Sequence, residues 1–315
     1  MESVDAGQLV ESAPKTGPFP APSDPILETN NPTEPTRGEQ KLTSVRPEIR
    51  QEDQELFNKT KARIEKTPDE LRVKIEKLRE TNARIVVDYR NRKGMDMDEK
   101  TINQLNSGIR SAENGIRIAE DKLRFLRPRD KTDIEYRLKV QNELASLILD
   151  NTPNGLPLRF HGTSIYNAEH IIKDGELSSS VDRLDIETSY DLSGQISVTK
   201  PDTVRTTLSY ADSITENYQL PAGCIFVMLP KSAEDAQRGD SMLMSNVSFK
   251  ENPQKLFAVL ASPEMLSKVK EWMTQSGLDA HKVFDHFAFI DQLKQVKQNI
   301  NSGLIKLEDV AGYKV

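Results

Sequence analysis

The feature that most constrains this chain is a heptad-like row of apolar residues in its first half. After Gly94, the apolar residues recur in alternating steps of three and four: Ile102, Leu105, Ile109, Ala112, Ile116, Ala119, Leu123 and Leu126. This spacing is typical of the a and d positions of a coiled-coil helix. A similar row precedes Gly94: Leu71, Ile75, Leu78, Asn82, Ile85 and Tyr89. Two such rows joined by a short glycine-containing turn predict an antiparallel helical hairpin.

The boundaries of the helical region follow from capping signals. Thr67 and Pro68, followed by two acidic residues, predict a helix that starts there, with a shorter helix over 51–66 before it. A third helix is expected over 132–149, so the helical region spans 47–150.

Within the hairpin, the polar Asn82 in one row and the small Ala112 and Ala119 in the other predict register control and a close approach of the two helices. We expect Ile109, Ile116 and Leu123 to be buried against the row that contains Ile75.

Composition limits what the rest of the chain can be. Residues 1–46 are rich in Pro, Ser, Thr and Glu, and such a segment has too little apolar surface to offset its ordering entropy. We therefore expect a disordered tail. The net charge of −6 and the pI near 5.5 argue against broad binding to nucleic acid or anionic membranes. No recognisable signal peptide and no apolar span of the length a membrane requires are found, so we expect a cytoplasmic protein.

The single cysteine bounds the chemistry further. Cys224 alone excludes an intramolecular disulfide framework and a cysteine-rich zinc site. It lies in the apolar run 223–229, so we interpret it as a buried hydrophobic residue, and we expect no metal site.

Beyond Gly155, short strands alternate with helices. The expected strands are 158–161, 195–199, 223–229, 241–249 and 256–261, and the expected helices are 164–173, 202–212, 263–276 and 281–300. This pattern predicts an α+β fold with a mixed sheet. We assign 156–262 to an α+β domain and 263–315 to C-terminal helices and a tail.

The most informative string is Arg159-Phe-His-Gly-Thr-Ser164, followed by a helix that ends at Gly175. A strand ending in His-Gly-Thr before such a helix resembles the opening of the ADP-ribosyltransferase fold, in its diphtheria-toxin and poly-ADP-ribose-polymerase branch. The resemblance implies that NAD is a substrate. It also implies that His161 binds the nicotinamide ribose, that the Gly162 backbone binds the carboxamide, and that Thr163 belongs to the same site. A glycine lets a planar amide approach the backbone closely.

The resemblance extends to a glycine-led strand, 194–199, and a helix that reaches Tyr210. It implies that Tyr210 stacks on the nicotinamide ring, facing His161, and that Ser197 joins the cofactor-binding residues. Two positions depart from the family pattern. Ile196 stands where the family has a strand tyrosine, and no glutamate opens the penultimate strand. Asp240 lies just before that strand, so His161 and Asp240 are the catalytic candidates.

Three functions are therefore open. The first is an NAD-dependent ADP-ribosyltransferase-like enzyme with an unknown acceptor. The second is a non-catalytic module that binds NAD or ADP-ribose. The third is a coiled-coil adaptor that binds a protein partner through the hairpin and has no small-molecule ligand. RNA 2′-phosphotransferases share a His-Gly-Thr-Ser opening, but the further basic and histidine motifs of that family are not found here.

Plain alternatives exist for the individual residues. His161 is equally well explained as a strand-end histidine bonded to a carbonyl, and Tyr210 as a core aromatic. We expect Arg159 to be solvated or ion-paired, and His170 to lie on a helix surface.

Overall fold

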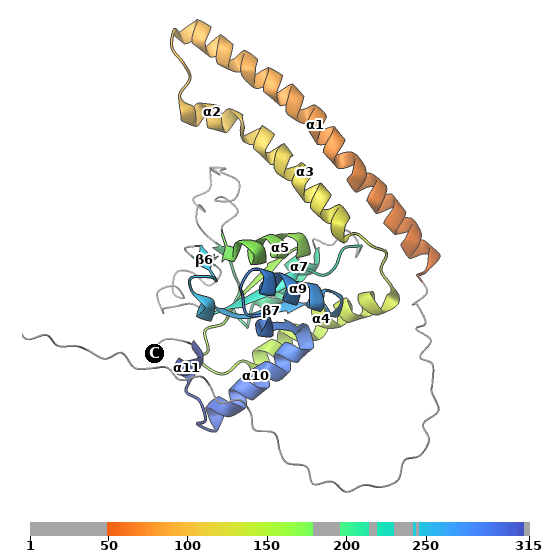
Figure 1. Ribbon diagram of the computed structural model, residues 1–315, viewed down its shortest axis with the longest axis vertical. Coiled ribbons are helices and arrows are strands. Elements are labelled where there is room, and N and C mark those ends of the chain that lie inside the picture. The colour runs from red at the N-terminus through yellow and green to blue at the C-terminus, as the bar shows by residue number, and fades with distance from the viewer. Residues whose placement is uncertain (1–48, 179–195, 214–218, 230–241, 244–245, 312–315) are drawn as a thin grey trace, which may run out of the picture. The chain divides into compact units, whose positions relative to one another are not determined.

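The computed structural model describes residues 49–178, 196–213, 219–229, 242–243 and 246–311 (Figure 1). The tail predicted over 1–46 and the candidate Asp240 lie outside these residues. Residues Pro47–Val315 form one compact unit. In the described part of the chain, no helix combines the length and the apolar character needed to cross a membrane.

The long helix α1, Gln51–Lys93, runs through the position where a helix start is predicted. Pro68 lies inside it, so the predicted start at Thr67 is wrong. The Thr67 hydroxyl donates to the Arg63 carbonyl (3.2 Å) and does not cap a new helix. Ile64 and Ile75, before and after the proline, are both buried. The continuous buried face of the helix therefore outweighs the tendency of Pro68 to break it. Gly94 ends α1 in the left-handed conformation (φ 66°), as predicted.

The second arm of the hairpin is broken. It consists of α2, Glu99–Leu105, and α3, Ser107–Phe125, which meet at Asn106. Asn82 of α1 bonds across this break: its Nδ2 donates to the Leu105 carbonyl (2.9 Å) and to Asn106 Oδ1 (3.1 Å). Asn82 thus contacts the partner arm at the end of α2, where the Leu105 carbonyl needs a hydrogen-bond donor.

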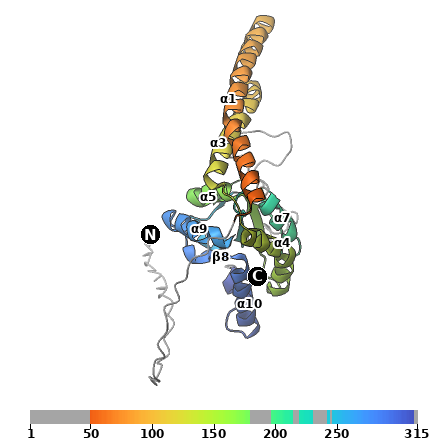
Figure 2. The ribbon, with the colours of Figure 1, turned by 90° about the vertical axis from the view of Figure 1, so that its right-hand side faces the viewer.

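Helices α1 and α3 lie side by side and antiparallel (Figures 1 and 2). Their contact uses small residues. Ala112 and Ala119 are buried, and a Cβ at Gly115 would lie 2.8 Å from Leu71 Cδ1. Ile109, Ile116 and Leu123 are only half-buried, contrary to expectation. The contact is displaced from the large aliphatic residues to the small ones because small side chains let two helices approach closely.

Helix α4, Lys131–Asn151, leads into a four-stranded sheet with the order β1-β4-β7-β8. These strands are Arg159–Thr163, Cys224–Met228, Leu256–Ala261 and Val283–Asp285. β4 pairs antiparallel with both of its neighbours, and β7 pairs parallel with β8. Four short strands form two further pairs, β2–β6 and β3–β5: Glu176–Leu177, Val247–Ser248, Ile196–Ser197 and Met242–Leu243.

Helices cover both faces of the four-stranded sheet. α5 (Ile165–Asp174) and α9 (Pro263–Gln275) pack on one face and form what we call the first core, which includes Phe226 of β4. α4, α7 (Val204–Ser213) and α10 (His286–Asn301) pack on the other and form the second core, which includes Val227. The 3-10 turns Pro253–Lys255 and Ala280–Lys282 and the short α11, Leu307–Ala311, complete the described elements. The predicted mixture of helices and a mixed sheet is confirmed.

Three details differ from the predicted elements. β8 is an additional strand, and α10 therefore begins at His286 and not near His281. The predicted strand 241–249 is divided between β5 and β6, which pair with different partners. Cys224 is buried as expected, and burial raises the pKa of its thiol to about 12.

Candidate functional site

Strand β1 carries the His-Gly-Thr string, and its side chains alternate between the two cores. His161 pairs with Phe226, a first-core residue, and Gly162 pairs with Ile225 of the second core. Because side chains alternate along a strand, half-buried His161 lies on the first-core face. Gly162 lies on the face that α7 covers.

Helix α7 packs closely on Gly162. A Cβ at this position would lie 2.7 Å from the Thr207 carbonyl oxygen and 2.9 Å from Thr207 Cγ2. No larger residue fits unless α7 moves away. A glycine is therefore required here for the packing of α7, whatever ligand the site takes.

On the outer edge of β1, opposite β4, the described residues form a backbone bridge at Phe160. Phe160 N donates to the Thr199 carbonyl and Thr199 N donates to the Phe160 carbonyl, both at 2.9 Å. In an antiparallel ladder, residues two apart direct their N–H and C=O to the same edge. Gly162 therefore directs both groups to the outer edge, one step beyond the Thr199 bridge. The described residues form no further backbone bridge with Gly162 there.

Thr207 is a polar residue of this edge that the sequence analysis does not single out. Its Oγ1 lies 2.7 Å from Thr199 Oγ1 and 3.4 Å from the Phe160 carbonyl oxygen. The hydroxyl is buried beside the bridge between Phe160 and Thr199. Its signal in the sequence is weak, since a threonine on the inward face of a helix is common.

The other candidates are placed only in part. Thr163 is buried and pairs with Cys224 on the first-core side. Ser197 lies on β3 and Tyr210 on α7, but their side chains are outside the described residues, as is all of Asp240. Helix α7, which carries Tyr210, and His161 lie on opposite faces of β1, so the expectation that Tyr210 faces His161 across a cleft on one side of the sheet is wrong. A ligand that touches both must lie at the outer edge, in the plane of the sheet.

The Arg159 side chain is buried and not solvated. The residue is 7% exposed, and its Nη1 donates to the Leu158 carbonyl at 3.0 Å. A buried guanidinium keeps its charge only when carbonyls or carboxylates accept its hydrogens. Arg159 is therefore part of the interior at the start of β1 and not a solvated strand residue.

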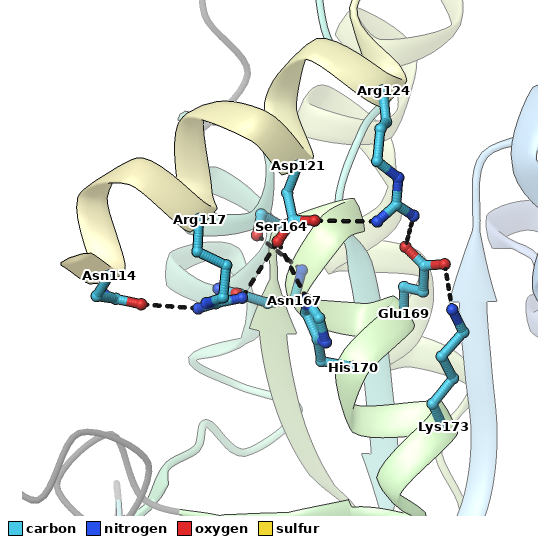
Figure 3. A network of polar contacts seen from close by, with 9 residues as sticks. All are labelled: Asn114, Arg117, Asp121, Arg124, Ser164, Asn167, Glu169, His170 and Lys173. Carbon is cyan, nitrogen blue, oxygen red and sulfur yellow. Dashed lines mark hydrogen bonds and ion pairs between the residues drawn. The ribbon is translucent and has the colours of Figure 1, made fainter. Parts of the chain in front are cut away.

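The helix after the motif is fixed at both ends. The Ser164 hydroxyl accepts the Asn167 N–H (3.3 Å) at the start of α5, and Gly175 ends it in the left-handed conformation. Helix α5 also joins the hairpin to the sheet, as Figure 3 shows.

Two buried carboxylates make that connection. Asp121 of α3 accepts from Arg124 (3.0 Å) and lies 3.1 Å from His170 Nε2, while Arg124 also bonds Glu169 of α5. Glu169 accepts from Lys173 at 2.7 Å. His170, expected on a helix surface, lies on the side of α5 that faces the hairpin. Burial alone would raise the pKa of Glu169, but Lys173 and Arg124 outweigh it and the pKa is lowered.

A separate small cavity lies between α4, α7, β4 and α10. It is lined by residues of α4, α7, β4 and α10: Tyr136, Arg137, Gln141, Leu208, Ile225 and His286. Its volume of about 20 Å³ suits a water molecule and no nucleotide. His286 Nδ1 lies 3.1 Å from the Tyr136 hydroxyl, and burial lowers the pKa of His286 to about 4.

The described residues include no group of three or more His, Cys, Asp or Glu side chains suited to a metal ion. Comparisons of the chain with protein-family models, curated proteins and solved structures find no match. The candidate site is therefore argued from its own geometry.

Proposed function

We propose that the outer edge of β1 binds the nicotinamide end of NAD, in an ADP-ribosyltransferase-like domain. The observation that carries the proposal is the direction of the Gly162 N–H and C=O: they point to an edge where, among the residues that the structure describes, the bridge to Thr199 ends at Phe160. The nicotinamide carboxamide presents one of its two N–H donors beside its C=O acceptor along one edge, as a strand residue presents its own N–H and C=O. It can therefore add to this edge as the next residue of a strand would.

The neighbours of Gly162 suit the two parts of such a ligand. On the first-core side, His161 is half-buried and presents ring nitrogens that can bond a ribose hydroxyl. On the α7 side, Thr207 lies against Gly162, and Tyr210 follows one turn later. A flat ring held at the edge lies between these two sides.

The chemistry implied is cleavage of the bond between nicotinamide and ribose. Positive charge develops on the ribose as that bond breaks, and a carboxylate beside it stabilises this charge. Asp240 is the candidate carboxylate from sequence, and His161 would hold the ribose in position. An acceptor nucleophile, or water, then takes the ADP-ribose.

A second candidate is a binding module that holds NAD or ADP-ribose without turnover. The observation in its favour is the sequence at the start of the penultimate strand, where Ser241 and Met242 stand and no glutamate is found. The hairpin would then present the bound nucleotide to a partner.

Titration of the full chain with NAD, followed by calorimetry, tests the proposal. His161→Ala should weaken binding about twofold to tenfold, as expected for one hydrogen bond. His281→Ala, a histidine in the 3-10 turn before β8, is the matched control and should bind as the parent does. If the parent chain does not bind NAD, the proposal fails.

Release of nicotinamide separates the two candidates. An enzyme should release it, and Asp240→Asn should abolish the release while NAD binding changes little. A module should bind NAD and release none.

A further inference from the structure

The two edges of α1, on either side of its contact with α3, carry charge in different ways. On one edge, arginines of α1 pair with glutamates of α3: Arg72 lies 3.5 Å from Glu120, and Arg79 lies 3.4 Å from Glu113. Acidic residues of α1 share this edge, as Asp69 and Glu76 do through bonds to the same two arginines. The two positive charges of this edge are therefore neutralised within the hairpin, and acidic residues are in excess there.

The other edge has an excess of cations. Exposed residues follow one another there in steps of three and four, which we call the basic stripe: Lys59, Arg63, Lys66, Glu70, Lys74, Lys77, Thr81, Arg84, Asp88 and Arg92. Such steps keep side chains on one side of a helix. At about 1.5 Å per residue the stripe runs about 50 Å. Within the described part of the chain, Lys66, Lys74 and Lys77 form no ion pair.

An apolar row borders the basic stripe. Leu71, Leu78 and Ile85 follow one another at seven-residue spacing, and Lys74 lies three residues after the first and four before the second. Leu71 and Leu78 are half-buried where they contact α3, Leu71 at Gly115 and Leu78 at Gly108. Ile85 is 40% exposed. Two helices therefore leave part of this row uncovered.

An apolar row at heptad spacing beside a row of charges is how a helix recognises another helix in a coiled coil. We propose that this edge of α1 docks an acidic amphipathic helix of another protein, which covers Ile85 and pairs with the basic stripe. A nucleic acid fits less well, because Glu70 and Asp88 within the stripe would face its phosphates. A bilayer fits less well, because three partly covered aliphatic side chains offer little to insert.

The probe for this surface is a synthetic four-heptad peptide with leucine at the a and d positions and glutamate at the flanking positions. Its binding to the full chain is measured by fluorescence anisotropy. The comparison probes are a polyglutamate peptide, a duplex RNA and vesicles of phosphatidylcholine with or without phosphatidylserine. The parent chain should bind the amphipathic peptide more tightly than polyglutamate and than the other two probes.

Two variants locate the contact. Reversal of four stripe residues together, Lys66→Glu, Lys74→Glu, Lys77→Glu and Arg84→Glu, should weaken peptide binding about 30-fold or more. Ile85→Asn should weaken it about fivefold. The control is Lys61→Glu with Lys131→Glu, two exposed lysines outside the stripe, which should change it less than twofold.

Three results would overturn the proposal. One is failure of the amphipathic peptide to bind. Another is peptide binding that the stripe reversal leaves unchanged. The third is tighter, stripe-dependent binding of the duplex or of the phosphatidylserine vesicles, which would assign the stripe to that partner instead. Circular dichroism of each variant shows that the helices are retained.

Discussion

The hairpin and the sheet region use different means to hold their elements together. In the sheet region, helices cover both faces and side chains such as Phe226 and Leu144 are fully buried. In the hairpin, two helices meet along small residues, and Ile116 and Leu123 stay half-buried. Ion pairs at the hairpin surface add little, since exposed pairs contribute about 0–1 kcal/mol. Burial is therefore concentrated in one region, while the other depends on close approach and a few polar contacts.

This difference predicts that substitutions in the sheet region have the largest effects. Phe226 is completely buried and its ring stacks on Phe249 with centroids 5.9 Å apart. Phe226→Ala should lower the free energy of unfolding by about 3–5 kcal/mol. Ile116→Ala in the hairpin should cost about 1 kcal/mol. Ile116 is only half-buried, so its truncation removes less buried apolar area than that of Phe226. Urea unfolding monitored by circular dichroism compares them, and equal losses would contradict the distinction.

The buried histidine gives the sheet region a pH dependence. Burial lowers the pKa of His286 from 6.5 to about 4. Between these pH values the unfolded chain binds a proton that the folded chain does not, so stability falls as pH falls from about 6.5 to 4. The loss should approach roughly 3 kcal/mol. His286→Asn should flatten this part of the stability curve, measured by urea unfolding at several pH values. An unchanged slope would mean that another group titrates.

Overpacking tests the small-residue contact of the hairpin. Ala119 is 4% exposed, so Ala119→Leu should force α1 and α3 apart and cost about 1–3 kcal/mol. Ala83→Leu, at an exposed position of α1, is the control and should lie within about 0.5 kcal/mol of the parent. Hydrogen exchange of α1 reports the effect locally. Equal protection in both variants would contradict a contact built on small residues.

The smallest effect is expected at the break in the second arm. Asn82→Ala removes the bonds to Leu105 and Asn106 and should cost about 0.5–1.5 kcal/mol. Hydrogen exchange should increase in α2 and leave α10 unchanged. Asn103→Ala, an exposed residue of α2, is the matched control. Increased exchange in both variants would mean that the hydrogen bonds of Asn82 do not specifically stabilise α2.

The sequence allowed the existence of both regions to be predicted, but not their contacts. Continuous apolar runs such as 224–228 identified buried strands, because a strand between two helix layers is apolar on both faces. The heptad row predicted two packed helices and included Ala112 and Ala119, which the structure buries, yet Ile116 of the same row stays half-buried. Periodicity fixes which side of a helix is apolar only to within about one residue, and the partner decides which members are covered. Local signals have the same limit: Thr67 and Pro68 predicted a helix start, but α1 continues through them.

For the candidate site, the sequence identified the string but not its geometry. The placement of His161 and α7 on opposite faces of β1 depends on strand pairing, which no local pattern reveals. The packing role of Gly162 and the position of Thr207 likewise depend on how α7 meets the sheet.

The most direct test of the central claim is the backbone amide of Gly162, observed by nuclear magnetic resonance during titration of the full chain with nicotinamide. The amide of Gly162 should shift with nicotinamide. It should shift less with nicotinic acid, whose carboxylate lacks the N–H donor that the Gly162 carbonyl would accept. The amide of Gly277, a glycine in an open turn after α9, should not respond. Saturation of the ligand with no change at Gly162, or shifts confined to other regions, would contradict a nicotinamide site at the outer edge of β1.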